Sequence, residues 1–491
     1  GMGGEVDVNA KLPLSGGTIT GNLSVTGDIQ SSTAGTSNFR AGVNAGNSIQ
    51  SGGNYNVVVG DEAGTALTTG DGNVALGYGA LIAEDTGLYS TALGYEALAN
   101  QNNDSSNYNT AVGTQAGRSV TTGVRNTIIG GIAGDALTDA DDNTVLGYNA
   151  LTSDTLGSKT VAIGRSVLSS QNFTSATDTY NTAVGYNAGG QVTTGLRNTL
   201  IGGLAGDAIT TATNNIALGY SSISSNTTSS NNVAVGNLAL NAFNITTGGD
   251  GYNVAVGTSA GGAVTTGIGN TFVGGSAGSS TDDGNNNTAV GYLALNGNCG
   301  NTNVAVGYLT LQSCTGTDNT AVGPVAGNVL SSGNINTFVG HDSGRYISTG
   351  SKNVILGSYN GNQHSLDIRT SSNNIVLSDG DGNPRVVTDS TGKTRAQSYA
   401  ETYVSLSGTT PAVDCNNGNV FALTTSGNTT FTFSNPPASG TAYGFTLKVT
   451  SGGSHTIAYP NTVDFAGATA PDAPASGETD VLVFFTVDGG T

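Results

Sequence analysis

A short motif recurs through most of this 491-residue chain, and its spacing constrains the fold more than any other feature. The motif is Asn-(Val/Thr/Ile)-x-(Val/Ile/Leu)-Gly, and 18 copies follow one another, mostly 17 residues apart. Asn occupies the first position except where Ser90 and Thr160 replace it. A fixed period of this length is typical of a solenoid, in which each repeat packs on its neighbours. The closing glycines are Gly60, Gly77, Gly94, Gly113, Gly130, Gly147, Gly164, Gly185, Gly202, Gly219, Gly236, Gly257, Gly274, Gly291, Gly307, Gly323, Gly340 and Gly357.

The motif alternates like a β-strand, so its second and fourth positions share one face and its third position lies on the other. The second position is always β-branched and the fourth is always Val, Ile or Leu. We expect both to fill the interior of a coil. The third position is usually Ala, as in Ala75 and Ala111, and we expect it to face outward. The glycine should form a bend with positive φ, and the Asn side chains should stack as an amide ladder.

A second short run, Gly-x-x-Ala-(Gly/Leu), follows most of these glycines, as in residues 94–98. It predicts a second strand, so that each coil holds about two strands and two turns. Strands this short cannot bury a face alone, so the coils must stack in parallel and share backbone hydrogen bonds. The predicted fold is all-β, a parallel β-roll or β-solenoid of about 18 coils over residues 49–360.

A longer period of 72 residues overlies the short one, because the segments around Gly113, Gly185 and Gly257 align directly. A fourth copy with shortened loops follows them. In the second coil of each block the usually small third position is large, and we expect these side chains to pack against neighbouring chains. They are Ile128, Leu200, Phe272 and Phe338.

The charge balance excludes some classes of partner. The formal net charge is −19 with only 14 Lys and Arg residues, so the chain lacks the basic clusters that neutralise phosphates, and no nucleic acid is expected. No stretch approaches 18 consecutive apolar residues, so no membrane insertion is expected. No leader with a basic start and an apolar run is visible.

Candidate chemistry is sparse, and no catalytic residue, cofactor site or metal site is predicted. Three cysteines are too few for a disulfide framework, which fits assembly in a reducing compartment. Cys299 and Cys314 fall in adjacent coils, where they would form either a disulfide or two buried thiols. Residues 379–383 alternate oxygen side chains as a calcium loop does, but no bidentate Glu follows, and Asp-Gly pairs also favour turns.

The motif resembles the head repeat of trimeric autotransporter adhesins of the YadA type, whose coils carry an NSVAIG-like sequence. The match is residues 180–185, Tyr-Asn-Thr-Ala-Val-Gly, and their siblings over residues 49–360. The resemblance implies a left-handed parallel β-roll and a homotrimer. This chain departs from that family in its longer coils of 17 residues.

The flanking segments resemble phage tail fibres instead. Residues 12–23, LPLSGGTITGNL, are similar to a segment common in those fibres, and residues 373–384 resemble a segment that follows such repeats. Together they imply a fibre on the virion. Its expected partners are other tail or baseplate proteins and a host cell-surface glycan or lipopolysaccharide.

The two ends differ from the repeats. We expect a virion-proximal segment over residues 1–48, a connector over 361–397 and a small antiparallel β-sandwich or similar β-domain over 398–491. Alternating runs in the last of these predict its core, and Pro-Pro and Gly-Gly pairs supply the turns. The run residues are Phe431, Phe433, Phe445, Leu447, Val449, Ile457, Tyr459, Val481, Val483 and Phe485.

Surface tyrosines are the candidate contact residues, because aromatic side chains can stack on sugars. Insertions in solenoids lie on one face, so the longer loops that end at Tyr108, Tyr180 and Tyr252 are favoured. Tyr443 and Tyr459 are the candidates in the C-terminal region. The leading hypothesis is a non-enzymatic tail fibre with a distal receptor-binding or trimerisation domain. The alternatives are a surface adhesin of the autotransporter type and a tailspike-like polysaccharide depolymerase.

Overall fold

The computed structural model describes residues 34–487. Within this range the chain forms β-strands, turns and one short 3-10 helix, and it has no α-helix, which confirms the all-β fold class. The chain divides into two units, the first up to Arg395 and the second from Ala396. Of the expected N-terminal segment, residues 1–33 lie outside the described range.

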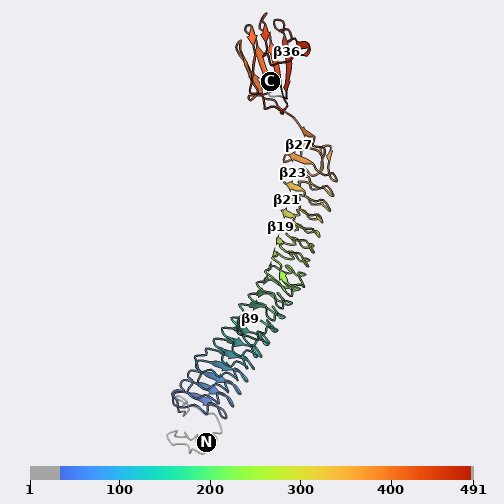
Figure 1. Cartoon of the computed structure of the whole chain (residues 1–491). Helices are drawn as coiled ribbons and strands as arrows, with labels where there is room; N and C mark the ends of the chain where they lie inside the picture. The colour runs from blue at the N-terminus through green and yellow to red at the C-terminus, as the bar shows by residue number, and fades with distance from the viewer. Residues whose placement is uncertain (1–33, 488–491) are drawn as a thin grey trace, which may run out of the picture. The chain divides into compact units, whose positions relative to one another are not determined.

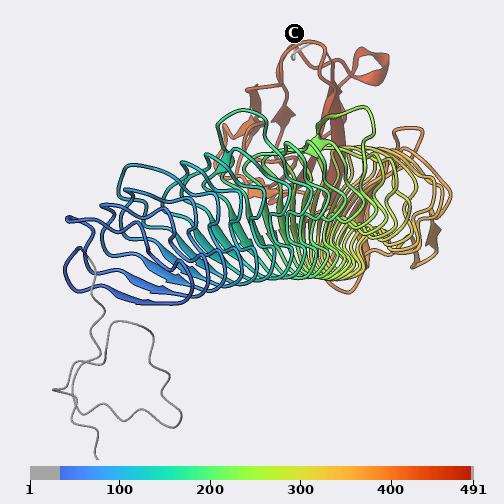
Figure 2. The same cartoon turned by 90° about the horizontal axis from the view of Figure 1, so that it is seen from below.

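In the first unit each coil adds one strand to a parallel ladder, and the coils stack along it (Figures 1 and 2). Pairing is in register, so that Val74 lies opposite Thr91 and Ala75 opposite Ala92. This confirms the parallel β-solenoid. The ladder strands are β1 (Phe39–Ala41), β2 (Val57–Val59), β3 (Val74–Leu76), β4 (Thr91–Leu93), β5 (Thr110–Val112), β6 (Thr127–Ile129), β7 (Thr144–Leu146), β9 (Val161–Ile163), β11 (Thr182–Val184), β12 (Thr199–Ile201), β13 (Ile216–Leu218), β15 (Val233–Val235), β17 (Val254–Val256), β18 (Thr271–Val273), β19 (Thr288–Val290), β20 (Val304–Val306), β21 (Thr320–Val322), β22 (Thr337–Val339), β23 (Val354–Leu356) and β26 (Ile375–Ser378).

The ladder extends one coil beyond the expected shaft of residues 49–360 at each end, through β1 and β26. Asn38 and Asn374 accordingly hold the first motif position there. Neither coil matches the motif as it was defined. Phe39 is not β-branched, and Ser378 occupies the position of the closing glycine. The ladder pairing depends on the backbone, so it tolerates these side chains.

The expectation of a second strand in each coil was wrong. The run after each glycine forms turns, as in residues 95–100. Two of its residues, Glu96 and Leu98, have φ of 51° and 48°, and left-handed backbone interrupts a strand. These turns still bond from coil to coil, because the N–H of Leu98 donates to the carbonyl of Ala116 at 3.1 Å.

The asparagines stack as predicted and are buried. Typically the backbone N–H of Asn73 donates to Oδ1 of Asn56 at 2.8 Å, and Asn73 Nδ2 donates to the carbonyl of Gly87 at 2.8 Å. Each side chain therefore ties two coils together through backbone groups. From Asn232 onward several neighbouring amides also bond to each other directly, as Asn336 does to Asn319 at 3.0 Å.

The closing glycine has positive φ in all 18 coils, between 105° and 146°, as predicted. A second constraint adds to this one, because these glycines stack closely. A Cβ at Gly113 would lie 2.5 Å from the carbonyl oxygen of Gly130 in the next coil. No other residue type satisfies both requirements without strain.

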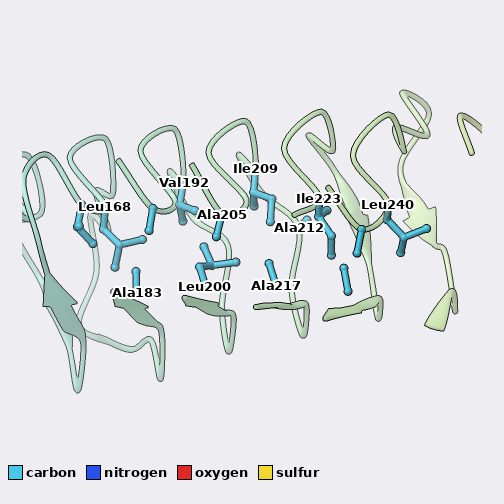
Figure 3. Close-up of a cluster of buried hydrophobic side chains, with 14 of the residues drawn as sticks. Leu168, Ala183, Val192, Leu200, Ala205, Ile209, Ala212, Ala217, Ile223 and Leu240 are labelled. Carbon is cyan, nitrogen blue, oxygen red and sulfur yellow. The ribbon is translucent and has the colours of Figure 1, made fainter. Parts of the chain in front are cut away.

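The prediction of which strand face is interior was wrong. The third motif position is fully buried in all 18 coils, whereas the fourth position is never buried. Figure 3 shows Ala183 and Ala217 pointing into the coil, between the strands and the turns that carry Val192 and Ile209. The coil is thin, so a small side chain fits inside, and the larger aliphatic side chain of the fourth position lies outside.

The large residues of the 72-residue period also lie inside, where the third position is fully buried, rather than on neighbouring chains. Glycines in the facing turns make room for them. A Cβ at Gly278 would lie 2.3 Å from Cε1 of Phe272, and one at Gly261 would lie 2.9 Å from Cδ2 of the same ring. In coils whose third position is Ala, the equivalent turn residue is often a buried leucine such as Leu98.

Three small sheets and a cap accompany the ladder. Loop insertions pair β8 (Gly157–Ser158) with β10 (Thr177–Asp178), and β14 (Ser229–Ser230) with β16 (Gly249–Asp250). In the expected connector, β24 (Asn362–Gln363) and β25 (Leu366–Asp367) form a hairpin, and β27 (Pro384–Thr388) pairs antiparallel with β26. The strand β28 (Thr394–Ala396) completes this sheet.

The second unit is mostly parallel rather than antiparallel, which corrects the expected antiparallel sandwich. Strands from successive passes of the chain lie side by side in three small sheets, and only β34 and β36 pair antiparallel among the strands described there. Phe421, Phe431 and Leu447 lie in its core. Its elements are β29 (Tyr403–Ser405), β30 (Ala412–Asp414), β31 (Val420–Thr424), β32 (Thr429–Thr430), β33 (Thr432–Ser434), β34 (Tyr443–Thr450), β35 (Ile457–Ala458), η1 (Ala466–Ala468) and β36 (Thr479–Thr486).

Candidate functional site

An aliphatic stripe runs along the outer face of the ladder. It consists of the fourth motif position, one Val, Ile or Leu from each coil, and its more exposed members are 36% to 42% accessible. Neighbours along the stripe are about 4.8 Å apart, the spacing of paired strands. The stripe residues are Val59, Leu76, Leu93, Val112, Ile129, Leu146, Ile163, Val184, Ile201, Leu218, Val235, Val256, Val273, Val290, Val306, Val322, Val339 and Leu356.

A tyrosine column borders this stripe, separated from it by the closing glycine. Its members are 47% to 57% exposed, and those in adjacent coils stack, with ring centroids 5.3 Å apart for Tyr78 and Tyr95 and 6.1 Å apart for Tyr292 and Tyr308. Together the stripe and the column give the ladder a broad apolar flank. The column consists of Tyr78, Tyr95, Tyr148, Tyr186, Tyr220, Tyr292 and Tyr308.

The predicted contact residues Tyr108, Tyr180 and Tyr252 are exposed, but they do not form one site. Each immediately precedes a motif's first position and has φ near 50°. They recur every fourth coil, so roughly 19 Å separates each from the next along the stack. They are therefore three equivalent surface positions, each with its own neighbours.

Acidic residues from the loop insertions contact two of these tyrosines. The hydroxyl of Tyr252 donates to Oδ2 of Asp250 at 2.6 Å, and this bond raises the pKa of the Tyr252 phenol. Tyr180 donates to Asp178 at 3.2 Å and lies beneath the ammonium of Lys159, 5.4 Å from the ring centroid. The Lys159 hydrogen bond lowers the pKa of Asp178. Aromatic rings beside hydrogen-bonding groups suit sugar binding, which stays a prediction for these positions.

The other two predicted contact residues lie largely inside the second unit. Tyr443 donates to the carbonyl of Gly418 at 2.7 Å, and burial raises its pKa. Tyr459 stacks on Phe431 with ring centroids 5.8 Å apart, and burial raises its pKa to about 12. Both residues support the core, so they are poorer contact candidates than the three exposed tyrosines.

A buried carboxylate fills the gap where the asparagine ladder is interrupted at Ser90. Gln101 Nε2 donates to Oγ of Ser90 at 2.7 Å and to Oε2 of Glu84 at 2.8 Å, and its own Oε1 accepts from Asn109 at 2.8 Å. Gln101 thus links Ser90 to Asn109, the first motif positions of two successive coils, which an Asn side chain links directly elsewhere. Burial raises the pKa of Glu84, and the N–H donors around it oppose that shift.

The same network recurs at Thr160, the other interruption. Gln171 Nε2 donates to Asp154 Oδ2 at 2.6 Å and to Thr160 Oγ1 at 3.2 Å. In the next block Asn226 and Phe243 take the equivalent positions, and the ladder residue is the usual Asn. These two buried carboxylates are therefore structural, because their oxygens are engaged inside the coil.

The remaining candidate chemistry is also engaged internally. Cys299 and Cys314 are free and buried, and Sγ of Cys299 lies 3.1 Å from the carbonyl oxygen of Cys314. The hydrogen bond to Cys314, together with burial, raises the pKa of the Cys299 thiol. Asp379 accepts from Asn383 Nδ2 at 3.0 Å and forms an ion pair with Arg385 at 2.5 Å, and these bonds lower its pKa. Its oxygens thus stabilise the β26–β27 turn.

Metal-binding clusters and membrane-spanning helices are not found in the described part of the chain. Within residues 34–487, no three His, Cys, Asp or Glu side chains gather as they would around a metal ion. Over the same residues, no helix has the length and hydrophobicity required to cross a bilayer. No protein-family model, curated protein or solved structure matches this chain.

Proposed function

We propose that this chain is a non-enzymatic fibre subunit, whose copies associate side by side through the aliphatic stripe. The observation that carries the proposal is the outward orientation of the fourth motif position, which leaves an apolar flank along every coil. Soluble monomers rarely expose apolar patches larger than a few hundred Å². A flank this long therefore favours an interface.

The energetics support association along the full ladder. Burying a further 60 Å² or so of aliphatic surface in each coil contributes roughly 1.5 kcal/mol per coil. Because the pairing of β1 through β26 fixes one spacing for every coil, parallel copies match their stripes in register over their whole length. The tyrosine column would lie at the edge of that interface, where aromatic side chains are favoured. We propose a homotrimer, because the resemblance to adhesin heads implies three associated chains.

The proposed role of the repeat unit is the shaft of a phage tail fibre that attaches the virion to the host cell surface. The resemblance of the flanking segments to tail fibres supports this role. The acidic balance of the chain keeps separate rods apart except where uncharged flanks meet. The exposed tyrosines of the loop insertions, Tyr108, Tyr180 and Tyr252, are the proposed contacts for a host glycan or lipopolysaccharide. The virion-side partners are tail or baseplate proteins.

The association is tested by analytical ultracentrifugation of the full chain and of a Leu146→Lys, Leu218→Lys variant. Both positions are 42% exposed, so the substitutions leave the coil interior intact. The wild type should sediment as a trimer and the variant as a monomer with unchanged circular dichroism. A matched control, Ser153→Lys, Ser225→Lys, adds the same two charges at exposed positions away from the stripe. A monomeric wild type would refute the proposed interface.

The role is tested by immunogold electron microscopy with antibodies raised against the full chain. Gold on virion tails supports the tail fibre, whereas gold on a bacterial envelope favours the adhesin. Incubating the chain with host polysaccharide and measuring reducing ends tests the third hypothesis, because only a depolymerase releases them.

A further inference from the structure

The edge strand of the second unit, β36, is apolar on both faces. Phe484 packs against the core and Leu482 is half-buried, while the opposite face, continued by Val487 just after the strand, exposes four side chains more fully than any member of the aliphatic stripe. These residues, named here the β36 face, are Val481 at 63% exposure, Val483 at 76%, Phe485 at 71% and Val487 at 53%. The sequence pattern correctly predicted that Val481, Val483 and Phe485 share one face, but the prediction that this face lies in the core was wrong.

The surroundings of β36 are open. A cavity of about 530 Å³ lies beside it, lined by aromatic residues such as Phe433 and Phe484 and by polar residues such as Thr462 and Asp464. The strand pairs with β34 on one side, and no described strand pairs with its other edge. Natural sheets protect such edges with charges, prolines or bulges, and β36 has none of these between Val481 and Phe485.

The chemistry of the face restricts what could cover it. Its four side chains carry no hydrogen-bonding or charged group, and the nearest charge on this side of the sheet is the exposed Lys448 opposite Val481, so a glycan gains little from the face. A second copy of the chain presents the same uncharged, apolar strand face and is therefore complementary.

The size of the patch explains why it would act together with the stripe. The four side chains expose roughly 400 Å² of apolar surface, and a standard interface buries about 800 Å² per partner. Alone the patch is too small for a stable complex. Parallel copies joined along the first unit would hold their second units at a high effective concentration, which makes a small patch sufficient.

We propose that the β36 face is a second self-association surface, through which the second units of neighbouring copies pack around a common axis. The inference rests on the proposed parallel association of the first units. The β36 faces of all copies would then meet, shield the open strand edge and close the assembly at its C-terminal end. The β36 face thus makes the second unit an oligomerisation clamp.

The test compares Val483→Lys with a matched control, Thr424→Lys, in the full chain. Thr424 is an exposed residue at the end of β31 in the same sheet, so both variants add one charge to that sheet. Hydrogen–deuterium exchange of β36 and sedimentation are measured over a concentration series. We expect Val483→Lys to accelerate exchange in β36 at least tenfold and to weaken association, and the control to leave both unchanged.

The outcomes separate this inference from the proposed function. If the wild type is an oligomer but β36 exchanges at the same rate in oligomer and monomer, the β36 inference is wrong and the stripe interface stands. If Val483→Lys lowers the sedimenting mass while the Leu146→Lys, Leu218→Lys variant does not, the β36 face stands and the stripe interface is wrong. Circular dichroism shows whether each variant is folded, and since Val483 is mostly exposed, its replacement should leave the subunit intact.

Discussion

At the scale of single residues, the closing glycine is the position least able to change. At Gly130 the backbone has φ of 136°, and a Cβ would lie 2.5 Å from the carbonyl oxygen of Gly147. The neighbouring Gly131 lacks both constraints, since its nearest atom would be 3.6 Å away on Tyr148. The two adjacent glycines therefore form a matched pair.

We expect Gly130→Ala to lower the free energy of unfolding by about 3 kcal/mol, because backbone strain and a steric clash add. Gly131→Ala should change it by less than about 1 kcal/mol. Urea denaturation followed by circular dichroism measures both. Equal effects of the two substitutions would contradict the stacking constraint.

The buried Glu84 predicts a pH dependence of stability. Burial raises its pKa, so the folded protein holds the proton more tightly than the unfolded chain does. The stabilisation from that proton is complete below the ordinary value of 4.5 and is lost as the pH rises through the raised pKa. Relative to Glu84→Gln, the wild type should lose stability as the pH rises from 4.5 toward neutrality.

Chemical denaturation of both proteins across that range measures the difference. The comparison with Glu84→Gln cancels the titration of the other carboxylates, which both proteins share. A difference that does not vary with pH would show that Glu84 titrates as it does in the unfolded chain.

At the scale of the element, the interior of each coil is filled in alternative ways. Phe272 occupies the space above Gly278, where the three atoms nearest to an added Cβ would all belong to its ring, the closest at 2.3 Å. Several sibling coils with Ala at the third position carry leucine at the turn position instead, and Leu98 holds φ of 48° there. Gly278 has φ of 61°, so its backbone already suits that leucine.

We expect Phe272→Ala to cost about 3 to 5 kcal/mol through the cavity it leaves. Gly278→Leu alone should also be strongly destabilising, because the ring blocks the new side chain. The double variant should recover much of the loss, since the leucine fills the space vacated by the ring. Urea denaturation of the four proteins gives the coupling energy, and strictly additive losses would contradict this packing.

Sequence periodicity predicts the elements better than it predicts their orientation. Spacing alone identified the strands, the asparagine ladder and the positive φ of the glycines, because each depends on local backbone geometry. A period of two shows which residues share a face, but it does not show which face is inside. The small Ala75 was the available signal, since a thin coil has room for only a small interior residue.

The same ambiguity affected the second unit. Val481, Val483 and Phe485 alternate as a core face does, but Leu482 and Phe484 between them are also apolar. When both faces of a strand are apolar, alternation cannot select the inner one. The parallel pairing of its other strands was likewise invisible, because strand direction depends on contacts distant in sequence.

At the scale of the whole molecule, the solenoid should tolerate changes in length that preserve its phase. Each coil bonds mainly to its two neighbours, so stability is approximately a sum over coils and their contacts. Gly185 and Gly257 stand at equivalent positions of successive 72-residue blocks. Deleting residues 186–257 therefore removes four coils. In the shortened chain β18 would pair with β11 instead of with β17.

We expect this deletion variant to fold with an unchanged circular dichroism spectrum per residue and a solenoid shorter by roughly 19 Å. Electron microscopy of rotary-shadowed particles measures the length. The control deletes residues 186–249, which ends inside a coil and leaves the strands out of phase with their turns. That control should aggregate or unfold, because the asparagines and glycines on either side of the deletion no longer stack. If both deletions fold equally well, the register of the ladder is not what holds the coils together.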